Sequence, residues 1–445
     1  MSTERSTAAP SVSAVATAWW PLALSWMLMG VELPMISAVV ARLPDPAVQL
    51  AAFGGVVFPL ALLIEAPVIM MLAASTALST NDRAFRVLRG FMTRLAAIMT
   101  VLHILIAFTP LYDWVVVPVL DVPADVIEPA RLGLMIMTPW TWAIADRRFH
   151  QGLLIRFGHR SAIATGTAIR LGATVSTLLI GWLILQAEGV VVASSALAIG
   201  TISEAIYARL RARTVIRGPL QHNAIDERVV KGRELLRFYV PLALTPLLVI
   251  AMQPIGSAGI DRMPNAVLSL AVWAPLNGLV FMCRSAGVAF NEVVISHCGD
   301  ARSITSLRRF AWLAGTLFTL ALALVAFTPI GTFWFRTVMG LEIELADLGT
   351  SSLWIASLIP LLTFLQSLYQ GVLVQAHRTR AITESVLIFL LVTCTVLGIG
   401  VAMQPEHGLT AVLIALTLGN IAQAFWLWLR CQRTVFRSTA TTSTN

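Results

Sequence analysis

Long apolar runs recur along the whole chain, from Trp19 to Leu429. A helix crosses the hydrocarbon of a bilayer with about 20 consecutive apolar residues. Hydrophobic residues make up 57% of the 445 residues and charged residues only 12%, whereas soluble domains carry roughly 25% charged residues. The runs are too long for barrel strands and do not alternate, and backbone inside lipid must satisfy its own hydrogen bonds. We therefore predict an all-α polytopic membrane protein.

The hydropathy pattern divides into twelve expected membrane spans. They are 19–41, 50–78, 88–110, 130–155, 162–186, 190–210, 236–260, 267–297, 310–330, 350–375, 382–403 and 409–430.

Basic residues divide unequally between the two sets of loops. The N-terminal tail, alternate loops and the segment from residue 430 on hold 23 of the 31 lysines and arginines, and the opposite loops hold four, Arg42, Arg131, Arg262 and Arg336. Loops rich in Lys and Arg lie in the cytoplasm, so we expect both termini there, in a multi-pass protein of the plasma (cytoplasmic or inner) membrane. The net charge of +8 is thus a topology signal, and we expect no nucleic-acid partner.

The second half of the chain repeats the first at an offset that stays constant to within one position. An even number of spans per half gives both halves the same orientation, so we expect two six-helix bundles related by a pseudo-two-fold axis along the membrane normal. The expected parts are a tail at 1–18, bundles at 19–210 and 236–430, a cytoplasmic linker at 211–235 and a tail at 431–445. The matches are "WPLAL" at 20–24 with "VPLAL" at 240–244, "AFTP" at 107–110 and 326–329, "QGLLI" at 151–155 with "QGVLV" at 370–374, and "AI" at 162–163 and 381–382.

Several stretches carry a resemblance to a known group of transporters. They are residues 21–54, Ala66-Pro67, "STNDR" at 79–83, "PLAL" at 241–244, Pro254, "IDR" at 260–262, "WAPLNG" at 273–278 and "CRSAGVAF" at 283–290. With the repeated 6+6 plan, they resemble the multidrug/oligosaccharidyl-lipid/polysaccharide (MOP) transporter superfamily, and within it the progressive ankylosis (ANK) family. The resemblance implies export of a citrate-, pyrophosphate- or nucleotide-like anion by alternating access. We expect a monomer in the lipid bilayer, with H⁺ or Na⁺ as the coupling ion.

Glu65 stands in an apolar run, "LLIEAPVIMM" at 62–71. An ionised carboxylate buried alone is costly, so it needs a partner, a proton or water. The repeat places Glu65 in register with Arg284, and the spans that carry them line the cavity of the 6+6 plan. We hypothesise that the two side chains pair when the site is empty and that an anionic substrate competes for Arg284. The alternative is a permanent ion pair that locks the two halves together.

Arg147 and Arg148 lie about 12 Å inside the expected end of span four, at 1.5 Å per residue. Asp146 adjoins them and can neutralise one of the charges. Neighbouring positions on a helix diverge by about 100°, so we expect at most one of the two arginines to point squarely at the cavity while the other snorkels. Gln366 is the repeat partner of Arg147, and we expect it, with Asn277, to line the same cavity.

Glu32 lies in the middle of span one, two residues before Pro34, which bends the helix and frees a carbonyl group. A carboxylate beside such a bend suits proton coupling or gating, and a hydrogen-bonded structural Glu is the alternative. Arg170, eight residues into span five, either lines the cavity or snorkels. Glu32, Pro34 and Arg170, together with Asp146, are therefore our candidates for coupling and gating.

Signatures of other functional classes do not occur in the sequence. There is no Walker loop, no nucleophile elbow and no HExxH pair, and the four cysteines show no CxxC spacing. We therefore expect no enzyme, no cofactor and no metal site. Three alternatives stay open: a proton- or sodium-coupled cation or drug antiporter of the MATE type, a lipid-linked saccharide flippase, and a membrane scaffold that transports nothing.

Overall fold

A computed structural model describes residues 11–159, 161–222, 231–298, 301–376, 378 and 380–442. Residues 1–10 of the expected N-terminal tail, 223–230 of the linker and 443–445 of the C-terminal tail lie outside this set. Regular secondary structure in the described residues is entirely helical, which confirms the predicted all-α class.

The first half of the chain forms long helices joined by short ones, with π-helical turns (η) inside several of them. They are α1 (Val12–Gly30), α2 (Glu32–Val40), α3 (Pro46–Leu50), η1 (Ala51–Val57), α4 (Phe58–Ile69), α5 (Met71–Leu78), α6 (Asp82–Phe108), η2 (Tyr112–Val116), α7 (Val117–Leu120), α8 (Ala124–Arg156), α9 (Ser161–Ile180), η3 (Gly181–Leu185), α10 (Gly189–Ile216) and α11 (Pro219–His222).

The second half follows the same plan with different breaks. It comprises α12 (Arg233–Ile250), α13 (Met252–Asp261), α14 (Ala266–His297), α15 (Ala301–Phe327), α16 (Pro329–Thr332), η4 (Phe333–Val338), α17 (Ile343–Ala356), α18 (Ile359–Gln375), α19 (Arg380–Met403) and α20 (Gly408–Thr442). Helix α14 is continuous where the first half has α3 to α5, and α17 and α18 correspond to α8.

Membrane-spanning segments match the hydropathy pattern closely. Within the described residues, eleven helical segments are long and apolar enough to cross a membrane. The remaining long helix, α8, has 33 residues and carries the charged run Asp146, Arg147 and Arg148. Helices extend past several predicted ends, as α1 does by beginning at Val12, because hydropathy marks the part of a helix inside lipid.

The first helix of each half breaks at an equivalent place. The break falls at Val31, between α1 and α2, and at Ala251, between α12 and α13. Pro34 and Pro254 lie three residues further on, and a proline cannot donate a hydrogen bond to the carbonyl four residues earlier. The predicted bend at Pro34 is therefore present, and the repeat reproduces it at the corresponding place in the second half.

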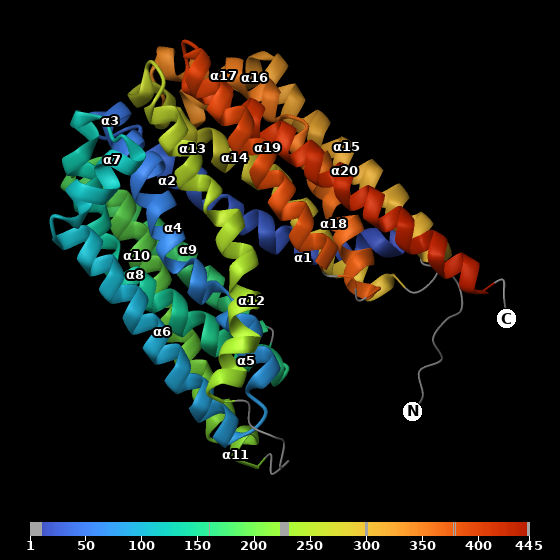
Figure 1. Ribbon diagram of the computed structural model, residues 1–445. Coiled ribbons are helices and arrows are strands. Elements are labelled where there is room, and N and C mark those ends of the chain that lie inside the picture. The colour runs from blue at the N-terminus through green and yellow to red at the C-terminus, as the bar shows by residue number, and fades with distance from the viewer. Residues whose placement is uncertain are drawn as a thin grey trace.

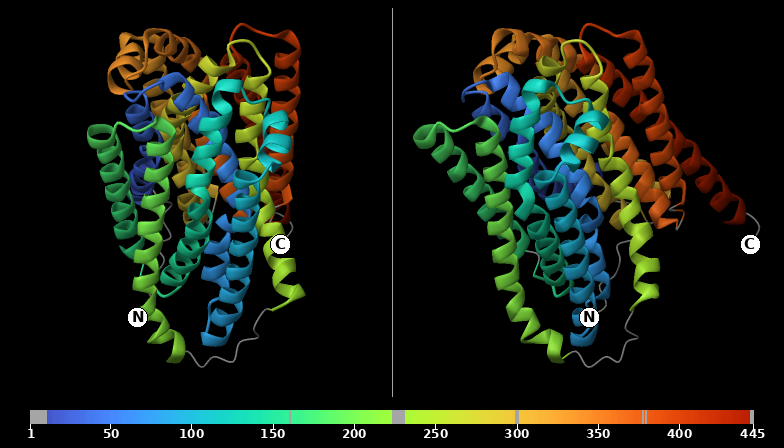
Figure 2. Two further views of the ribbon diagram at one scale, coloured as in Figure 1. Left: turned by 90° about the vertical axis from the view of Figure 1, so that its left-hand side faces the viewer. Right: turned by 60° about the vertical axis from the view of Figure 1, so that its left-hand side comes forward.

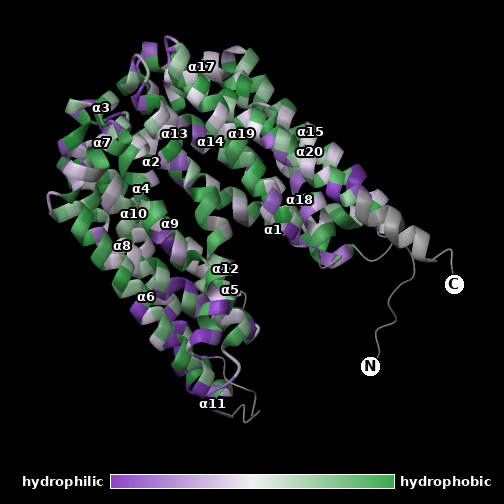
Figure 3. Cartoon of the chain, viewed as in Figure 1, coloured by the Kyte–Doolittle hydropathy of each residue, from purple (hydrophilic) through white to green (hydrophobic). Residues whose placement is uncertain are grey.

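The two bundles meet at one end and diverge toward the other, as Figure 1 and Figure 2 show. We call the meeting end, with the loops at 41–45 and 262–265, the closed end. The diverging end, which carries the α5–α6 turn and α11, is the basic end. Figure 3 shows apolar residues along the middle of the helices and hydrophilic ones gathered near α5 and α11 at the basic end.

Helices α1 and α12 cross from their own half to the other one. α1 packs along α14 and α15 of the second half, while α12 packs on α4 of the first. Trp19 is buried in the second bundle among Phe310, Phe318 and Phe364, and its indole N–H donates to the carbonyl of Ala286 at 2.8 Å. The crossing ties the bundles together through the kinked helices.

Candidate functional site

A cavity of about 340 Å³ lies between the two halves. Elements of the first half supply most of its wall, and α13 and α14 supply the rest. The charged residues that line it are Glu32, Glu65, Arg147, Arg148, Arg170 and Arg284, and the other polar or aromatic ones are Trp26, Phe58, Trp140, Gln253, Trp273, Asn277 and Phe281.

Glu32 and Arg170 form an ion pair on one side of this cavity. The Nε of Arg170 donates to Oε1 of Glu32 at 3.0 Å, and its Nη2 donates to Oε2. The hydroxyl of Thr174 donates to Oε1 at 3.2 Å. Glu32, at the α1–α2 break, is therefore hydrogen-bonded to Arg170 and Thr174. Arg170 itself lines the cavity.

Glu204 lies behind the cavity wall and links Arg147 to the pair of Glu32 and Arg170. Its Oε2 accepts from Nη1 of Arg147 and lies 3.8 Å from Nη1 of Arg170. Its Oε1 accepts from the amide of Gln151 at 2.9 Å. Arg147 and Arg170 therefore both have a carboxylate partner, and their charges are largely balanced.

Arg148 and Arg284 have no such partner among the described residues. Neither makes a hydrogen bond or an ion pair there, and the Nε of each is buried without an acceptor. Glu65 is 3% exposed, and its Oε2 also lacks a partner. The amide nitrogen of Asn277 is unsatisfied too. The polar groups left over in the cavity are two guanidinium groups, one carboxylate, one amide and the indole N–H of Trp273.

The hypothesised ion pair between Glu65 and Arg284 is absent in this conformation. Both side chains line the same cavity, but they do not come within ion-pair distance of each other. The charges that act on Glu65 are instead Arg147 and Arg148, across from it on α8. The physical reason is the divergence of the bundles, because α4 and α14 belong to different bundles, which separate toward the basic end.

Asp146 faces away from the cavity, contrary to its expected role as a counter-charge for its two neighbours. Its carboxylate accepts two hydrogen bonds from Arg209, at 2.6 and 3.1 Å, and lies 3.5 Å from Nδ1 of His150. It lines a separate groove between α8 and α10. Neighbouring side chains on a helix point about 100° apart. Asp146 and Arg147 therefore lie on different faces of α8.

Gln366 does not line the cavity either. Its amide donates to the carbonyl and the side-chain oxygen of Asn420, at 3.1 and 3.2 Å. The cavity draws more of its wall from the first half than from the second, so the repeat equivalent of an N-terminal wall residue need not reach it. Gln366 instead joins α18 to α20.

Sequence reasoning gave less weight to four residues that matter here. They are Glu204, behind the cavity wall, and the wall residues Trp140, Gln253 and Trp273. Trp140 donates to the hydroxyl of Thr201 at 2.9 Å, while the indole nitrogen of Trp273 has no acceptor. The depth of Glu204 in an apolar span was the available signal for a buried ion pair.

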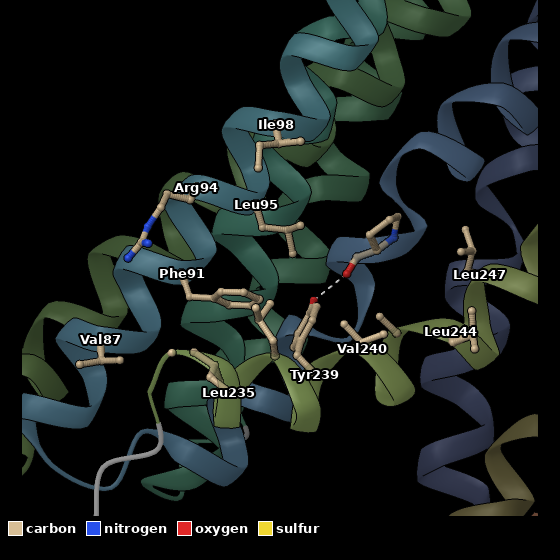
Figure 4. A pocket seen from close by; sticks show the side chains of 14 residues that line it. Val87, Phe91, Arg94, Leu95, Ile98, Leu235, Tyr239, Val240, Leu244 and Leu247 are labelled. Carbon is tan, nitrogen blue, oxygen red and sulfur yellow. Dashed lines mark hydrogen bonds between the residues drawn. The ribbon is translucent and has the colours of Figure 1, made fainter.

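A second hollow, between α6 and α12, has a different character. Phe91 packs edge-on against Tyr239, whose hydroxyl donates to the carbonyl of Pro67 at 2.6 Å (Figure 4). Its other wall residues are largely aliphatic, with Arg94 the one charged residue among the described residues that line it. This hollow offers no convergent polar groups, so it does not compete with the central cavity as a site for a polar ligand.

No group of three or more His, Cys, Asp or Glu side chains suited to hold a metal ion occurs in the part of the chain that the structure describes. The charged groups of the central cavity, four arginines and two glutamates, suit an ionic ligand.

Comparison with known proteins agrees with this architecture. No protein-family model and no curated protein matches the chain, but solved structures do. A multidrug resistance MATE family transporter of the MOP superfamily, in an inward-facing conformation, gives a TM-score of 0.66 at 16% identity, covering 93% of this chain and 98% of that one. The lipid II flippase MurJ, in an inward closed conformation, gives 0.72 at 14% identity, with 94% and 87% covered.

A third structure is a MOP superfamily transporter from Pyrococcus furiosus, in which reverse polarity of the binding pocket suggests a different function. It gives a TM-score of 0.62 at 15% identity and covers 95% and 97% of the two chains. At such identities the likeness shows the fold alone, which this chain shares with the MATE and MurJ structures. The resemblance to the ANK family stays a prediction.

Proposed function

We propose that this chain is a secondary transporter that exports small organic or phosphate-bearing anions by alternating access. The fold supports this, since proteins of this architecture have been solved in inward-facing and outward-facing conformations. The proposed substrate site is the cavity between the bundles, with Arg148 and Arg284 as the groups that bind the anion.

The observation that carries the proposal is the unpaired state of these two arginines. A guanidinium removed from water without a partner costs several kcal/mol, so Arg148 and Arg284 require water or an anion in the cavity. Guanidinium groups bind carboxylate and phosphate with two parallel hydrogen bonds. Two free cationic side chains against the single carboxylate of Glu65 leave an excess that an anion can balance.

Glu65 competes with the anionic substrate for the positive charges of the site. It lies within electrostatic reach of Arg147 and Arg148 and offsets part of their charge when the site is empty. A bound anion takes over that role, and a proton on Glu65 removes the repulsion between the two negative groups. Asn277, with its free amide N–H group, is placed to donate to the same ligand.

The ion pair of Glu32 and Arg170 is the proposed coupling and gating element. It links the α1–α2 break, with Pro34, to α9, so movement of the kinked helix must strain or break it. Protonation of Glu32 would release Arg170. H⁺ fits this mechanism directly as the coupling ion, and Na⁺ would need Glu32 to be freed first.

The side on which the bundles diverge indicates the side from which the cavity is open in this conformation. The basic end lies in the cytoplasm by the positive-inside rule, so the cavity of this conformation faces the cytoplasm. A substrate loaded from there is exported when the bundles rock to the opposite arrangement.

A flippase for a lipid-linked anion is the second candidate, because a neighbour in structure is described as a lipid II flippase. An anionic lipid headgroup would use the same two arginines. A cation antiporter of the MATE type is less consistent with the cavity, since Glu32 is already paired and only Glu65 remains to hold a cation.

The test is counterflow in proteoliposomes with citrate, pyrophosphate, ATP and two lipophilic cations, with and without a pH gradient. The wild type is expected to exchange at least one anion. Arg284→Gln and Arg148→Gln are each expected to lower that rate by about 10-fold or more, since a charge-assisted hydrogen bond contributes about 1.5–3 kcal/mol. Arg336→Gln, an exposed arginine outside the cavity, is the matched control. Exchange of cations with no anion exchange contradicts the proposal.

A further inference from the structure

Arg42 reaches from the end of α2 into the second half of the chain at the closed end. Its Nη2 donates to the carbonyls of Thr337 and Val338 at 2.8 and 3.0 Å, and its Nη1 donates to that of Met339 at 3.1 Å. The same Nη1 also meets the carbonyl of Ala38, one turn back on its own helix, at 2.5 Å.

Arg262 makes the corresponding contact from the second half to the first. Its Nη2 donates to the carbonyl of Val119 at 2.6 Å, and its Nη1 donates to that of Ala258, again one turn back, at 2.6 Å. Both arginines are exposed to solvent. Each arginine therefore bonds a carbonyl on its own helix and reaches the other half, Arg42 through three hydrogen bonds and Arg262 through one.

The repeat relates the members of these contacts. Arg42 corresponds to Arg262, Ala38 to Ala258 and the acceptor Val119 to the acceptor Met339, all at the same offset in the sequence. Three pairs of residues in one register, with a guanidinium bonded to a carbonyl of the other half in each contact, relate the two contacts by the pseudo-two-fold axis.

The acceptors have a shared chemistry. Val119 lies in α7 and Thr337 to Met339 close η4, so they belong to the last turn of a helical segment. Carbonyls of a last turn lack a partner within the helix and carry partial negative charge. A guanidinium satisfies several of them at once, which a lysine ammonium cannot do with the same geometry.

We propose that Arg42 and Arg262, with the carbonyls of 337–339 and of Val119, form a pseudo-symmetric latch that holds the closed end shut. Each arginine moves with one bundle and each acceptor with the other, so the closed end cannot open without breaking both contacts. The place of the latch in a transport cycle rests on the alternating-access function proposed above. Its effect on which end is open does not depend on the substrate.

Gly340 lies directly beside the guanidinium of Arg42. Its φ of +72° is one that side chains rarely adopt, and a Cβ built on it would lie 2.7 Å from Nη1 of Arg42. Only glycine leaves room for the guanidinium beside this turn.

The test measures access to the cavity from the closed end. A single cysteine replaces the cavity-lining Val280 in a chain whose four native cysteines are serine, and a membrane-impermeant maleimide is added to vesicles of each orientation. The variants are Arg42→Ala, Arg262→Ala and the two together. Arg336→Ala removes the same charge from the same end, where Arg336 makes no hydrogen bond or ion pair with the described residues.

In the parent protein, labelling is expected mainly from the basic end. The double variant is expected to raise the labelling rate from the closed end by roughly 10-fold or more, because loss of even one charge-assisted hydrogen bond shifts a two-state equilibrium by about that factor. The two single variants are expected to give smaller increases, the larger from Arg42→Ala, because Arg42 makes three hydrogen bonds to the other half and Arg262 makes one; Arg336→Ala is expected to give none.

Closed-end labelling of the double variant at the parental rate, with basic-end labelling intact, would overturn the latch. If the alanine variants lose labelling from both ends through misfolding, Arg42→Lys with Arg262→Lys decides the matter. This pair keeps the charges, and it must raise closed-end labelling if the forked contacts hold the end shut. Labelling needs no substrate, so absence of anion transport and absence of a latch are separate outcomes.

Discussion

Gly54 and Ala274 are equivalent positions in the repeat, and they touch each other between the two halves. A Cβ built on Gly54 would lie 2.2 Å from the Cβ of Ala274. A residue and its own equivalent can meet only beside the axis that relates them, so the pseudo-two-fold axis passes between η1 and α14 here. Both residues also line the central cavity, which places the cavity on that axis.

We expect Gly54→Ala to destabilise the protein by about 1–3 kcal/mol, the usual cost of overpacking a tight contact. Gly54→Ala with Ala274→Gly moves the single methyl group to the other side of the axis, where the nearest remaining atom, the Cα of residue 274, lies at 3.4 Å. The pair should recover most of the lost stability in thermal unfolding. A pair that is no more stable than Gly54→Ala alone contradicts this contact.

Glu32→Gln should destabilise the folded protein by about 3 kcal/mol, because it leaves the buried charge of Arg170 with Glu204, at 3.8 Å, as its remaining carboxylate. Glu32→Gln with Arg170→Gln removes both charges and should cost less than the single change. Denaturation in mixed micelles gives both values. If the double variant is the less stable of the two, the pair contributes little and the carboxylate acts alone.

Trp19→Ala tests the crossing of α1 into the second bundle. Trp19 is 8% exposed there, whereas its neighbour Trp20 is 57% exposed. Truncating a buried Trp typically costs about 3–5 kcal/mol, so Trp19→Ala should lower the unfolding temperature well below that of Trp20→Ala, the matched control. Equal effects from the two substitutions would show that α1 does not pack as described.

Asp146→Asn separates the two possible roles of this carboxylate. Because Asp146 pairs with Arg209 outside the cavity, the change should leave the KM of the transported anion within about twofold. A counter-charge to Arg147 or Arg148 would behave differently, since its loss would strengthen anion binding and lower KM.

Hydropathy and the repeat predicted the spans, their order and the two-bundle plan, because lipid leaves a chain few ways to satisfy its backbone. They also identified the residues whose charges meet in the cavity, among them Glu32, Glu65, Arg148 and Arg284. An ionisable side chain deep in a span is costly wherever it points, so its position in the sequence alone marks it.

Which carboxylate forms an ion pair with which arginine could not be predicted in the same way. Which carboxylate meets Arg147 depends on the rotation of α8 against α10, and the nearest acid in sequence, Asp146, is turned to the other face. Glu204 is the true partner, 57 residues away. The crossing of α1 likewise depends on packing between distant helices, to which local sequence contributes little.

Equilibrium binding of citrate and pyrophosphate to the purified protein, measured by calorimetry, tests the anion site between the bundles most directly. If Arg148 and Arg284 hold one anion, Arg148→Gln and Arg284→Gln should each raise Kd by about 10-fold or more. The double variant should lose less than the product of the two factors, because both groups act on one ligand. An unchanged Kd in both single variants, with wild-type binding intact, would contradict an anion site between the bundles.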